Sequence, residues 1–460
     1  MQIFARVVLW LLATSSMTAQ NCFAEAESVE TKQTALQPAH TGSVRDTVAL
    51  AVNNHPEIQA SLLGLRVQRD QLKQVESGFF PQVSLAVGIG REDSNNSSTR
   101  VETGRGSDEM ERREASLFVN QMLFDGFETY WLRKRQLEDI DAAELAAWHL
   151  SSEVALRSIE NHLNVAKSNK ILNDTIDNLQ AHERIAKDIG IRARLGKDDR
   201  AKVSQISARL SLSLANLEAA KNKVLQANAD YRREVGVMPG KKLHFQDKLF
   251  RMPDSQNDFL EDVMASNLLI ASKVKTTKSF LAGARAASHS DFPTLNLESG
   301  ASWNNNIDGV EGRNSDAFIM LRLRYDLFKG GADKAVKRQA QYLNKQARYE
   351  LDDVRRVIRR DAEQAWFSYQ SGSKRVSYLQ DYVESAQTTQ KAYVKQFNIG
   401  QRSLIDLLDA ENELLSAKRQ LIDAKNNLYL SKYQILNLKG TLLSIISIDT
   451  AKHLEVSIEG

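Results

Sequence analysis

The apolar residues follow two different spacings along the chain, and each spacing predicts a different kind of element. Over most of the chain they recur every three or four positions, as at Leu172, Ile176 and Leu179, with polar residues between them. This is the spacing of one face of a helix. In a few short segments apolar and polar residues instead alternate one by one, which is typical of strands. The sequence therefore predicts a mainly α-helical protein with a small β part.

Two alternating segments, 82–89 and 317–325, are predicted to be strands with one apolar face. In the second segment Arg322 and Arg324 lie on the opposite, polar face. Alternation over about ten residues is typical of strands in an outer membrane, with apolar side chains toward lipid and polar side chains toward a lumen. Each strand is expected to be part of a hairpin, which gives four transmembrane strands per chain. The apolar face comprises Val83, Leu85, Val87, Ile89, Ile319, Leu321, Leu323 and Tyr325.

A soluble hairpin with one wet face is the alternative interpretation of each alternating segment. The aromatic residues favour the membrane, because they gather at the helix-side ends of the hairpins, where an aromatic girdle would meet the membrane boundary. The polar segments 91–113 and 304–316 are predicted to be long external loops at the opposite ends. The aromatic residues are Phe79, Phe80, Phe124, Phe127, Tyr130, Trp131, Phe292, Tyr325 and Phe328.

Short sequence landmarks recur at a constant distance. LFDG at 123–126 is matched by LFKG at 327–330, and RLGKDD at 194–199 is matched by NIGQRS at 398–403, each 204 residues later. A period this long indicates a duplicated domain rather than an array of short repeats. The sequence therefore predicts one helix–hairpin–helix unit present twice, at 43–236 and 254–440.

Glycine and proline divide both units into the same succession of elements. None of the six prolines lies in 127–235 or 332–440, which are predicted to be helical. Helices of this length are stable only when packed side by side, as in a long antiparallel coiled coil. The first unit is expected to contain a helix, a β-hairpin at 79–124, a long helix at 127–189, a tip turn at 190–198 and a helix at 199–235. The second is expected to contain a helix, a β-hairpin at 291–327, a long helix at 332–397, a tip turn at 398–403 and a helix at 404–439.

The remaining helices solve a problem of length. Residues 43–77 and 199–235 are each about half as long as the continuous helix, so the two laid end to end roughly match it. Each unit can therefore build one continuous pillar and one made of two pieces. Segments 27–42, 237–253 and 441–460 would then lie at the joints at mid-level.

The N-terminus has the pattern of a secretory signal peptide over 1–26. Arg6 precedes the short apolar run Val7–Ala13, and Ala24 and Ala26 form a small-residue cleavage site. That run is too short to span a membrane. The single cysteine, Cys22, lies inside this segment, so the processed chain is expected to contain no disulfide and no thiol-based metal site. No later run of about 18 apolar residues follows.

Four strands in one chain leave two free edges. Unpaired backbone groups are not tolerated in hydrocarbon, so the sheet must be closed by other copies of the chain. Three copies sharing a barrel of 12 strands are one solution that this geometry allows. The sequence alone does not fix the number of copies.

Charge and composition exclude several classes of function. The net charge of +3 is the small difference between 61 basic and 58 acidic residues, which provides no concentrated basic surface for nucleic acid. The eight histidines are scattered without an H-x-x-x-H pair. The glycine pair Gly330 and Gly331 lacks the spacing of a phosphate-binding loop and is expected to serve a turn. We therefore expect no enzyme, no metal site and no cofactor.

The segment FNIGQRSLIDLLDAENELLSAKRQLIDAKNNL (397–428), the FFP and DFP strand entries and the LFDG and LFKG strand exits resemble the TolC family of bacterial outer-membrane efflux and secretion channels. The resemblance covers about 43–445. It implies a homotrimer in the outer membrane of a Gram-negative bacterium, with a 12-stranded barrel above a periplasmic α-helical tunnel and an equatorial belt.

The resemblance also implies roles for residues near the two turns. Gly196 and Gly400 would allow the left-handed backbone that reverses each helix. The turns would dock on a periplasmic adaptor and close the tunnel at rest, with Asp198, Asp199, Ser403 and Leu404 beside them. The entrance and constriction residues would be Asp406, Asp409, Arg402 and Phe397.

The charges at this entrance also have a physical interpretation. Asp406 and Asp409 are three residues apart, so both can lie on one helix face. Repeated by symmetry, they would form carboxylate rings that attract cations. The alternative is that both are ordinary acidic residues at a helix start. Arg402 matches an arginine that locks the closed state by pairing, but Lys202 stands where the family often has the acidic partner.

The implied function is a channel in a tripartite export system, with no covalent chemistry. The inner-membrane partner would be an ABC exporter in type I protein secretion, which the motif at 397–414 favours. The alternative is a proton-driven pump in multidrug or metal efflux. A further alternative of a different class is a periplasmic coiled-coil scaffold or adaptor, in which the hairpins would be soluble.

Overall fold

The computed structural model describes residues 42–97, 99–100, 108–196, 199–240, 243 and 252–446. All of them belong to one compact unit, Gly42–Gly460. The expected signal peptide, the segment 27–41, Asp198, most of 241–251 and residues 447–460 lie outside the described residues.

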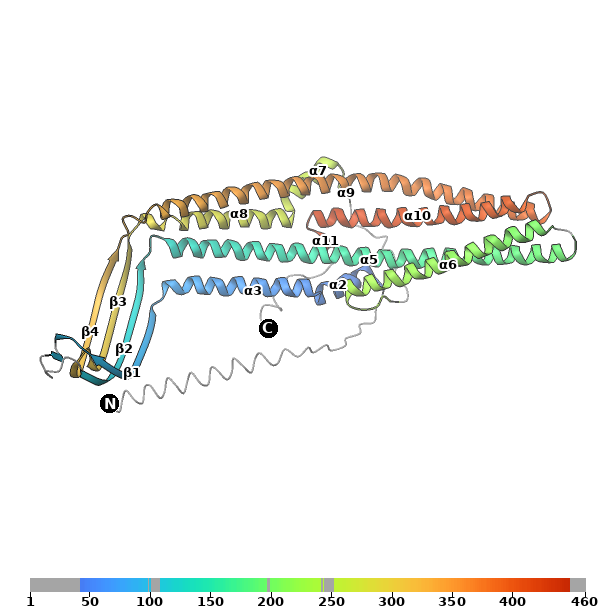
Figure 1. Cartoon of the computed structure of the whole chain (residues 1–460). Helices are drawn as coiled ribbons and strands as arrows, with labels where there is room; N and C mark the ends of the chain where they lie inside the picture. Colours follow the sequence, from blue (N-terminus) through green and yellow to red (C-terminus); the bar gives the residue numbers. More distant parts are fainter. Residues whose placement is uncertain are drawn as a thin grey trace. The chain divides into compact units, whose positions relative to one another are not determined.

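The described chain consists of long helices and one antiparallel sheet, which confirms the predicted fold class (Figure 1). The same succession of elements occurs twice. The first comprises α2 (Val44–Asn54), α3 (Pro56–Glu76), β1 (Gln82–Ser94), β2 (Asp108–Phe124), α5 (Glu128–Arg194) and α6 (Arg200–Val235). The second comprises α7 (Gln256–Ser266), α8 (Leu268–Ala286), β3 (Thr294–Ile307), β4 (Val310–Arg324), α9 (Ala332–Asn398) and α10 (Leu404–Leu438), followed by α11 (Leu442–Ile445).

The predicted single helix at 43–77 is in fact two helices. Pro56 begins α3 and has no backbone N–H to continue the hydrogen-bond ladder from α2. The His55 side chain caps the new helix by accepting from the N–H of Glu57 at 3.3 Å. In the second repeat Asn267 has the same position between α7 and α8, and its side chain accepts from the N–H groups of Leu269 and Ile270.

The long helix α5 ends later than predicted. It continues through Gly190 to Arg194, so the predicted tip turn at 190–198 begins several residues too early. A glycine inside a helix costs only about 1 kcal/mol. Ile185 and Ile189 are buried on the same turn of the helix and offset that cost. Both α5 and α9 contain 67 residues, which gives each a length of roughly 100 Å.

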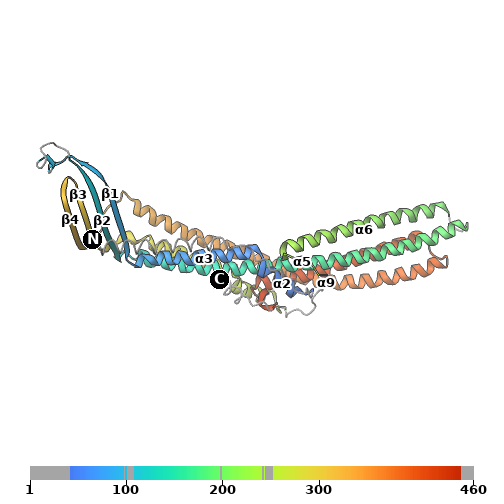
Figure 2. The same cartoon turned by 90° about the horizontal axis from the view of Figure 1, so that it is seen from below.

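The helices are arranged in one linear order. α3 and α6 pack against α5, α5 packs against α8 and α10, and these two pack against α9 (Figure 1 and Figure 2). The continuous helices α5 and α9 therefore each have a partner made of separate pieces. An apolar core lies where those pieces meet in each repeat, around Tyr231 in the first and Phe259 in the second, and α10 and α11 also contribute to the first.

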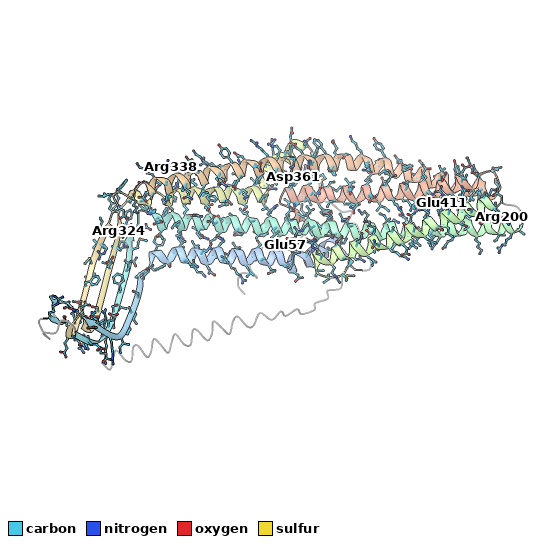
Figure 3. All side chains as sticks on the ribbon, viewed as in Figure 1. Glu57, Arg200, Arg324, Arg338, Asp361 and Glu411 are labelled. Carbon is cyan, nitrogen blue, oxygen red and sulfur yellow. The ribbon has the colours of Figure 1, made fainter. Side chains whose placement is uncertain are left out.

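The core of the first repeat also buries polar groups. The Thr47 hydroxyl lies 2.8 Å from Nδ1 of His162 and 3.0 Å from the Tyr231 hydroxyl, and all three side chains are buried. At the edge of this core, Arg157 donates to Glu57 at 2.6 Å and to Glu234 at 2.7 Å. These bonds connect α2, α3, α5 and α6 at the level of Glu57, which Figure 3 labels.

The four strands form one sheet in the order β1-β2-β3-β4. Its registers place the apolar residues of neighbouring strands side by side, as in the pairs Val83↔Val119, Leu117↔Ala301 and Leu297↔Leu321. One continuous apolar face therefore crosses the sheet, and its side chains are exposed, with Ile89 and Ile319 each 75% accessible. Within the part of the chain that the structure describes, the outer edges of β1 and β4 have no paired strand.

The strands are longer than predicted, and the prediction of a long loop at 304–316 is wrong. β3 and β4 are joined by a tight turn at Asp308 and Gly309, with φ angles of 56° and 74°. Positive φ at both central residues is the geometry of the two-residue hairpin turn that Asp-Gly favours. Both ends of the predicted loop at 91–113 also belong to strands, since β1 continues to Ser94 and β2 starts at Asp108.

The opposite face of the sheet is more polar. Arg322 donates to Glu298 of the neighbouring strand at 2.8 Å, and Arg324 lies 3.3 Å from Asp326. Gly300 lies between the rings of Phe118 and Phe318, its two register partners. Among the described residues, no helix has an 18-residue stretch apolar enough to cross a bilayer.

Candidate functional site

The two predicted turn glycines lie at the same end of the described unit, where α5 reverses into α6 and α9 reverses into α10 (Figure 1). Gly196 has a φ of 70° and Gly400 a φ of 79°, so both have the left-handed backbone that a side chain disfavours. One apolar cluster joins the two turns. It comprises Ile185, Ile189, Ile206, Phe397, Leu404, Leu407 and Leu408, from all four helices, and we call it the tip core.

Asp199 and Ser403 begin the helices that follow the turns. A carboxylate oxygen of Asp199 accepts from the N–H of Lys202 at 2.9 Å, and the Ser403 hydroxyl accepts from the N–H of Asp406 at 3.2 Å. These bonds satisfy N–H groups that the first helical turn leaves free. The position of both residues is therefore explained by helix capping, whether or not a partner also contacts them.

Leu404 and Phe397 belong to the tip core. Leu404 is 2% exposed, so its side chain is not available to an adaptor, and its predicted place in a docking surface needs correction. It is buried because a leucine at the first position of α10 turns toward Ile206 and Phe397. Phe397 is 8% exposed, and the guanidinium of Arg192 lies 5.1 Å from its ring centre.

Arg402 is held within its own hairpin. Its guanidinium lies 4.2 Å from the centre of the Tyr393 ring, and its Nε donates to Gln396 at 3.0 Å. A guanidinium over an aromatic face is attracted by the ring. The carboxylate of Asp406, one helical turn away, lies 3.8 Å from the same guanidinium. The structure therefore brings Arg402 and Asp406 together.

Asp409 is paired with the other repeat. Arg209 on α6 donates to its carboxylate at 3.0 Å, which makes a salt bridge between α6 and α10. Sequence reasoning missed Arg209, because a contact between two helices depends on how far one is shifted along the other. The resemblance to the family led us to expect an acidic residue of the first repeat paired with a basic residue of the second. Here the basic residue comes from the first repeat and the acidic residue from the second.

A chain of polar side chains, three of them buried and Gln390 half-buried, lies next to the tip core. The Ser213 hydroxyl donates to the Asn178 side-chain oxygen at 3.4 Å, and the Asn178 amide donates to the backbone carbonyl of Glu411 at 3.4 Å. The Gln390 amide donates to the Glu411 carboxylate at 2.5 Å. These four residues belong to α6, α5, α10 and α9, so the chain crosses both hairpins at the level of Glu411 (Figure 3).

The site therefore contains charges and hydrogen bonds that connect two hairpins. In the described part of the chain, no three histidine, cysteine, aspartate or glutamate side chains are placed to hold a metal ion. What this arrangement can do is hold the two hairpins together through contacts that water and ions can replace, such as the exposed pair of Arg209 and Asp409, while the pair of Arg402 and Asp406 stabilises the turn of the second hairpin.

Comparison with known proteins identifies the family. The model described as outer membrane efflux protein matches residues 47–237 and 260–441. BepC of Brucella suis biovar 1, an outer membrane efflux protein, is 25% identical over 423 residues, which cover 90% of this chain and 88% of BepC. TolC of Vibrio cholerae, an outer membrane protein, is 24% identical over 396 residues, which cover 82% of this chain and 86% of TolC.

A solved structure has the same fold. The outer membrane channel CmeC of Campylobacter jejuni matches with a TM-score of 0.78 and 14% identity, over 90% of this chain and 89% of that chain. The matched family is described as outer membrane efflux proteins and the solved structure as an outer membrane channel. An outer-membrane location does not fit the soluble scaffold that the sequence had left open. The chain therefore belongs to the outer membrane efflux protein family and, as its resemblance to the TolC family implies, is an outer-membrane channel protein of a Gram-negative bacterium.

Proposed function

We propose that this chain is one of three identical subunits of an export channel, and that it works with a periplasmic adaptor and an inner-membrane transporter. The observation that carries the proposal is the linear order of the fold. Both the sheet and the helix layer run from a first flank, at β1, α3 and α6, to a last flank, at β4 and α9. Each flank ends in groups that another copy of the chain can cover.

The last flank exposes an unusual number of large apolar side chains. On α9, Tyr342 is 64% exposed, Tyr349 75%, Phe367 53% and Tyr378 71%. The first flank exposes Leu63 and Val67 on α3, and Leu212, Leu214 and Leu225 on α6. Apolar surface of this extent supports an interaction surface. Since the two flanks differ, contact between successive copies would be head-to-tail, and such contacts form a ring when the rotation between copies closes.

Closure of the ring also completes the sheet. The free edge of β4 in one copy would pair with the free edge of β1 in the next, which removes every unpaired edge from the membrane. Three copies would contribute 12 strands, with the apolar face toward lipid. Arg322 and Arg324, with Glu298, would then face the lumen.

At the other end, the tip turns would surround the entrance. Repeated three times, Asp406 and Asp409 would form two carboxylate rings. The pair with Arg209 would hold the two hairpins of each copy together, and the pair with Arg402 would fix the turn of the second hairpin. An adaptor docking on the turns at Gly196 and Gly400, beside Asp198, Asp199 and Ser403, would release those pairs by competing for them. Opening would be a rearrangement of the four tip helices.

The substrate is proposed to be a protein exported by type I secretion, with an ABC exporter as the inner-membrane partner. The motif FNIGQRSLIDLLDAENEL at 397–414 supports this use through its resemblance to secretion-type members of the family. Multidrug or metal efflux with a proton-driven pump is the alternative, and the description of BepC as an efflux protein favours it.

One purified preparation tests the channel. The mature protein in detergent is expected to be a trimer that dissociates only on heating, and to conduct ions in planar bilayers. Neutralising both carboxylates, with D406N and D409N together, should reduce cation preference at unchanged trimer yield. A water-soluble monomer would contradict the channel, and unchanged selectivity would contradict the placement of the carboxylate rings.

The use is tested in cells. Deletion of the gene should remove one large secreted protein from the culture medium and leave resistance to drugs and metals nearly unchanged. Increased sensitivity with an unchanged set of secreted proteins would support efflux instead. The D406N/D409N double variant, returned to the deletion strain, connects either phenotype to the entrance.

A further inference from the structure

Three phenylalanine rings meet where the sheet joins the helices. The rings of Phe124 and Phe127 are 5.2 Å apart, and Phe292 lies 6.3 Å from the first and 6.1 Å from the second. All three pairs meet nearly edge to face. Phe124 is also the register partner of Leu295, which belongs to the apolar face of the sheet. The three rings therefore extend that face toward the helices.

Phe127 belongs to this cluster although its backbone conformation is unfavourable for a bulky residue. Its φ of 64° is left-handed, a conformation that bulky residues avoid. The equivalent residue of the second repeat, 204 positions later, is Gly331, with a φ of 87°. A glycine at position 127 would therefore be enough to form the turn. The presence of a phenylalanine there is explained by the contact of its ring with Phe124 and Phe292.

Two cations lie one helical turn beyond the phenylalanines. Trp131 follows Phe127 by one turn of α5, and the backbone N–H of Trp131 donates to the Phe127 carbonyl at 3.1 Å. The guanidinium of Arg285, from α8, lies 4.5 Å from the Trp131 ring centre, and the Lys134 ammonium lies 5.3 Å from it. Both cations are exposed to solvent.

Lys134 and Arg285 differ from the neighbouring cations, which lie close to carboxylates. Arg133 is paired with Glu76 at 2.7 Å, Arg135 lies 3.7 Å from Asp139, and Lys337 is paired with Asp291. Among the described residues, Lys134 and Arg285 have no carboxylate partner, and their contacts are with the Trp131 ring. The ring keeps two positive charges close together without neutralising either.

We propose that Lys134 and Arg285, held over Trp131, bind the phosphate group of an anionic phospholipid in the periplasmic leaflet of the outer membrane. From the sheet toward the helices, the order is apolar side chains, aromatic rings and cations. Lipid tails, the interface and the phosphate follow in the same order. One turn of helix, about 5.4 Å, separates Phe127 from Trp131, and the headgroup layer is about 5–8 Å deep.

Within the residues that the structure describes, the second repeat lacks a counterpart of this site. Ala335 stands where the second repeat would need the counterpart of Trp131, and Lys334 stands at the position of Tyr130. A trimer would therefore hold three such lipids rather than six. The inference rests on the outer-membrane location and is independent of which transporter uses the channel.

Native mass spectrometry of the detergent-purified full-length protein tests this site. With added phosphatidylglycerol, one retained lipid per chain is expected, and phosphatidylcholine should be retained less. The double variant K134Q/R285Q removes both charges and should weaken retention of phosphatidylglycerol roughly 30-fold. The matched control R133Q/K337Q removes the same charge from the same end of the molecule, from cations that have carboxylate partners, and should retain the lipid.

Three results would overturn the proposal. Equal loss in the two double variants would mean that total charge alone attracts the lipid. Displacement of the lipid by millimolar inorganic phosphate would mean that the site recognises a free anion. Absence of retained phosphatidylglycerol in the wild-type protein would remove the site. Single-channel conductance of each preparation separates these results from failure of the channel itself, which would abolish conductance in every variant.

Discussion

The Nη2 atom of Arg209 lies 3.0 Å from the Oδ1 atom of Asp409, although the two residues are 200 positions apart in the chain. The pair joins the first repeat to the second beside the tip core. Asp409 is 59% exposed and Arg209 34%, so the bond contributes little to stability, about 0–1 kcal/mol. Its importance lies in its position, because it fixes one hairpin against the other and neutralises one carboxylate at the proposed entrance.

Replacing Arg209 with glutamine should therefore affect gating more than stability. R209Q is expected to raise the open probability and the cation preference in planar bilayers, because Asp409 loses its partner, while the unfolding temperature changes little. R200Q is the matched control, since Arg200 is exposed and lies at the start of the same helix (Figure 3). Equal behaviour of the two variants would show that the pair has no part in closing the channel.

The turn at Gly400 should not tolerate a β-branched residue. A Cβ there would meet no atom within 4 Å, so any effect of Gly400→Val comes from its φ of 79°. Left-handed backbone costs a branched residue roughly 1–2 kcal/mol. We expect loss of export with trimers still formed, measured by secretion and by native electrophoresis.

Gly190 provides the control for Gly400. It is helical and equally free of contacts, so Gly190→Ala should stabilise α5 by about 0.5–1 kcal/mol and leave export intact. Full export by the Gly400→Val variant would mean that the turn can be rebuilt around a side chain.

Gly126 and Gly330 are equivalent residues of the two repeats, with φ angles of 72° and 62°. A Cβ on Gly126 would lie 2.5 Å from the carbonyl oxygen of His289, whereas a Cβ on Gly330 would meet nothing within 4 Å. Gly126→Ala should therefore lower the yield of folded trimer several-fold more than Gly330→Ala. Both alanine variants have the same kind of cost from a left-handed backbone, so the difference between their trimer yields measures the contact with His289. Similar yields would mean that this contact relaxes easily.

Acid should weaken the hydrogen bond from Arg157 to Glu57, which connects α5 to α3. The hydrogen bond from Arg157, together with its charge, holds the pKa of Glu57 below its ordinary value of 4.5. The pKa is lower in the folded protein, so this stabilisation is complete above about pH 5 and is lost as the pH falls toward the lower folded value. Unfolding temperatures measured from pH 7 to pH 3 should fall more steeply for the wild type than for E57Q.

Glu183 provides the comparison for Glu57, because it is exposed on α5. The variant E183Q should follow the wild-type curve across the same pH range. If E57Q followed that curve as well, the bond from Arg157 would not contribute to stability.

Much of the fold follows from local rules that the sequence displays. Alternation predicted the strands, the absence of proline and the scarcity of glycine predicted α5 and α9, and the distance of 204 residues predicted that α9 would repeat α5. The break at Asn267 was not predictable in the same way, because asparagine also occurs inside helices. The hairpin turn at Asp308 and Gly309 could have been found, since Asp-Gly between two alternating segments is a turn signal.

The residues around the turns were predicted only in part. The family motif pointed to Arg402, Asp406 and Asp409, which lie on one hairpin and so can be found by counting along the chain. Their partners could not be counted in this way. Arg209 depends on the shift between α6 and α10, and the bonds of Glu411 depend on how four helices pack around one buried layer. Tyr393 was missed as well, although it lies on the same hairpin as Arg402.

The breaks in the helical pillars have a mechanical consequence. α5 and α9 are single rods, while the pieces beside them, α3 with α6 and α8 with α10, are separate segments. Because α6 is not continuous with α3, and α10 is not continuous with α8, sliding of α6 or α10 near the two turns does not pull directly on α3 or α8. We therefore expect that the proposed channel can change its shape at its periplasmic end while the strands in the membrane keep theirs.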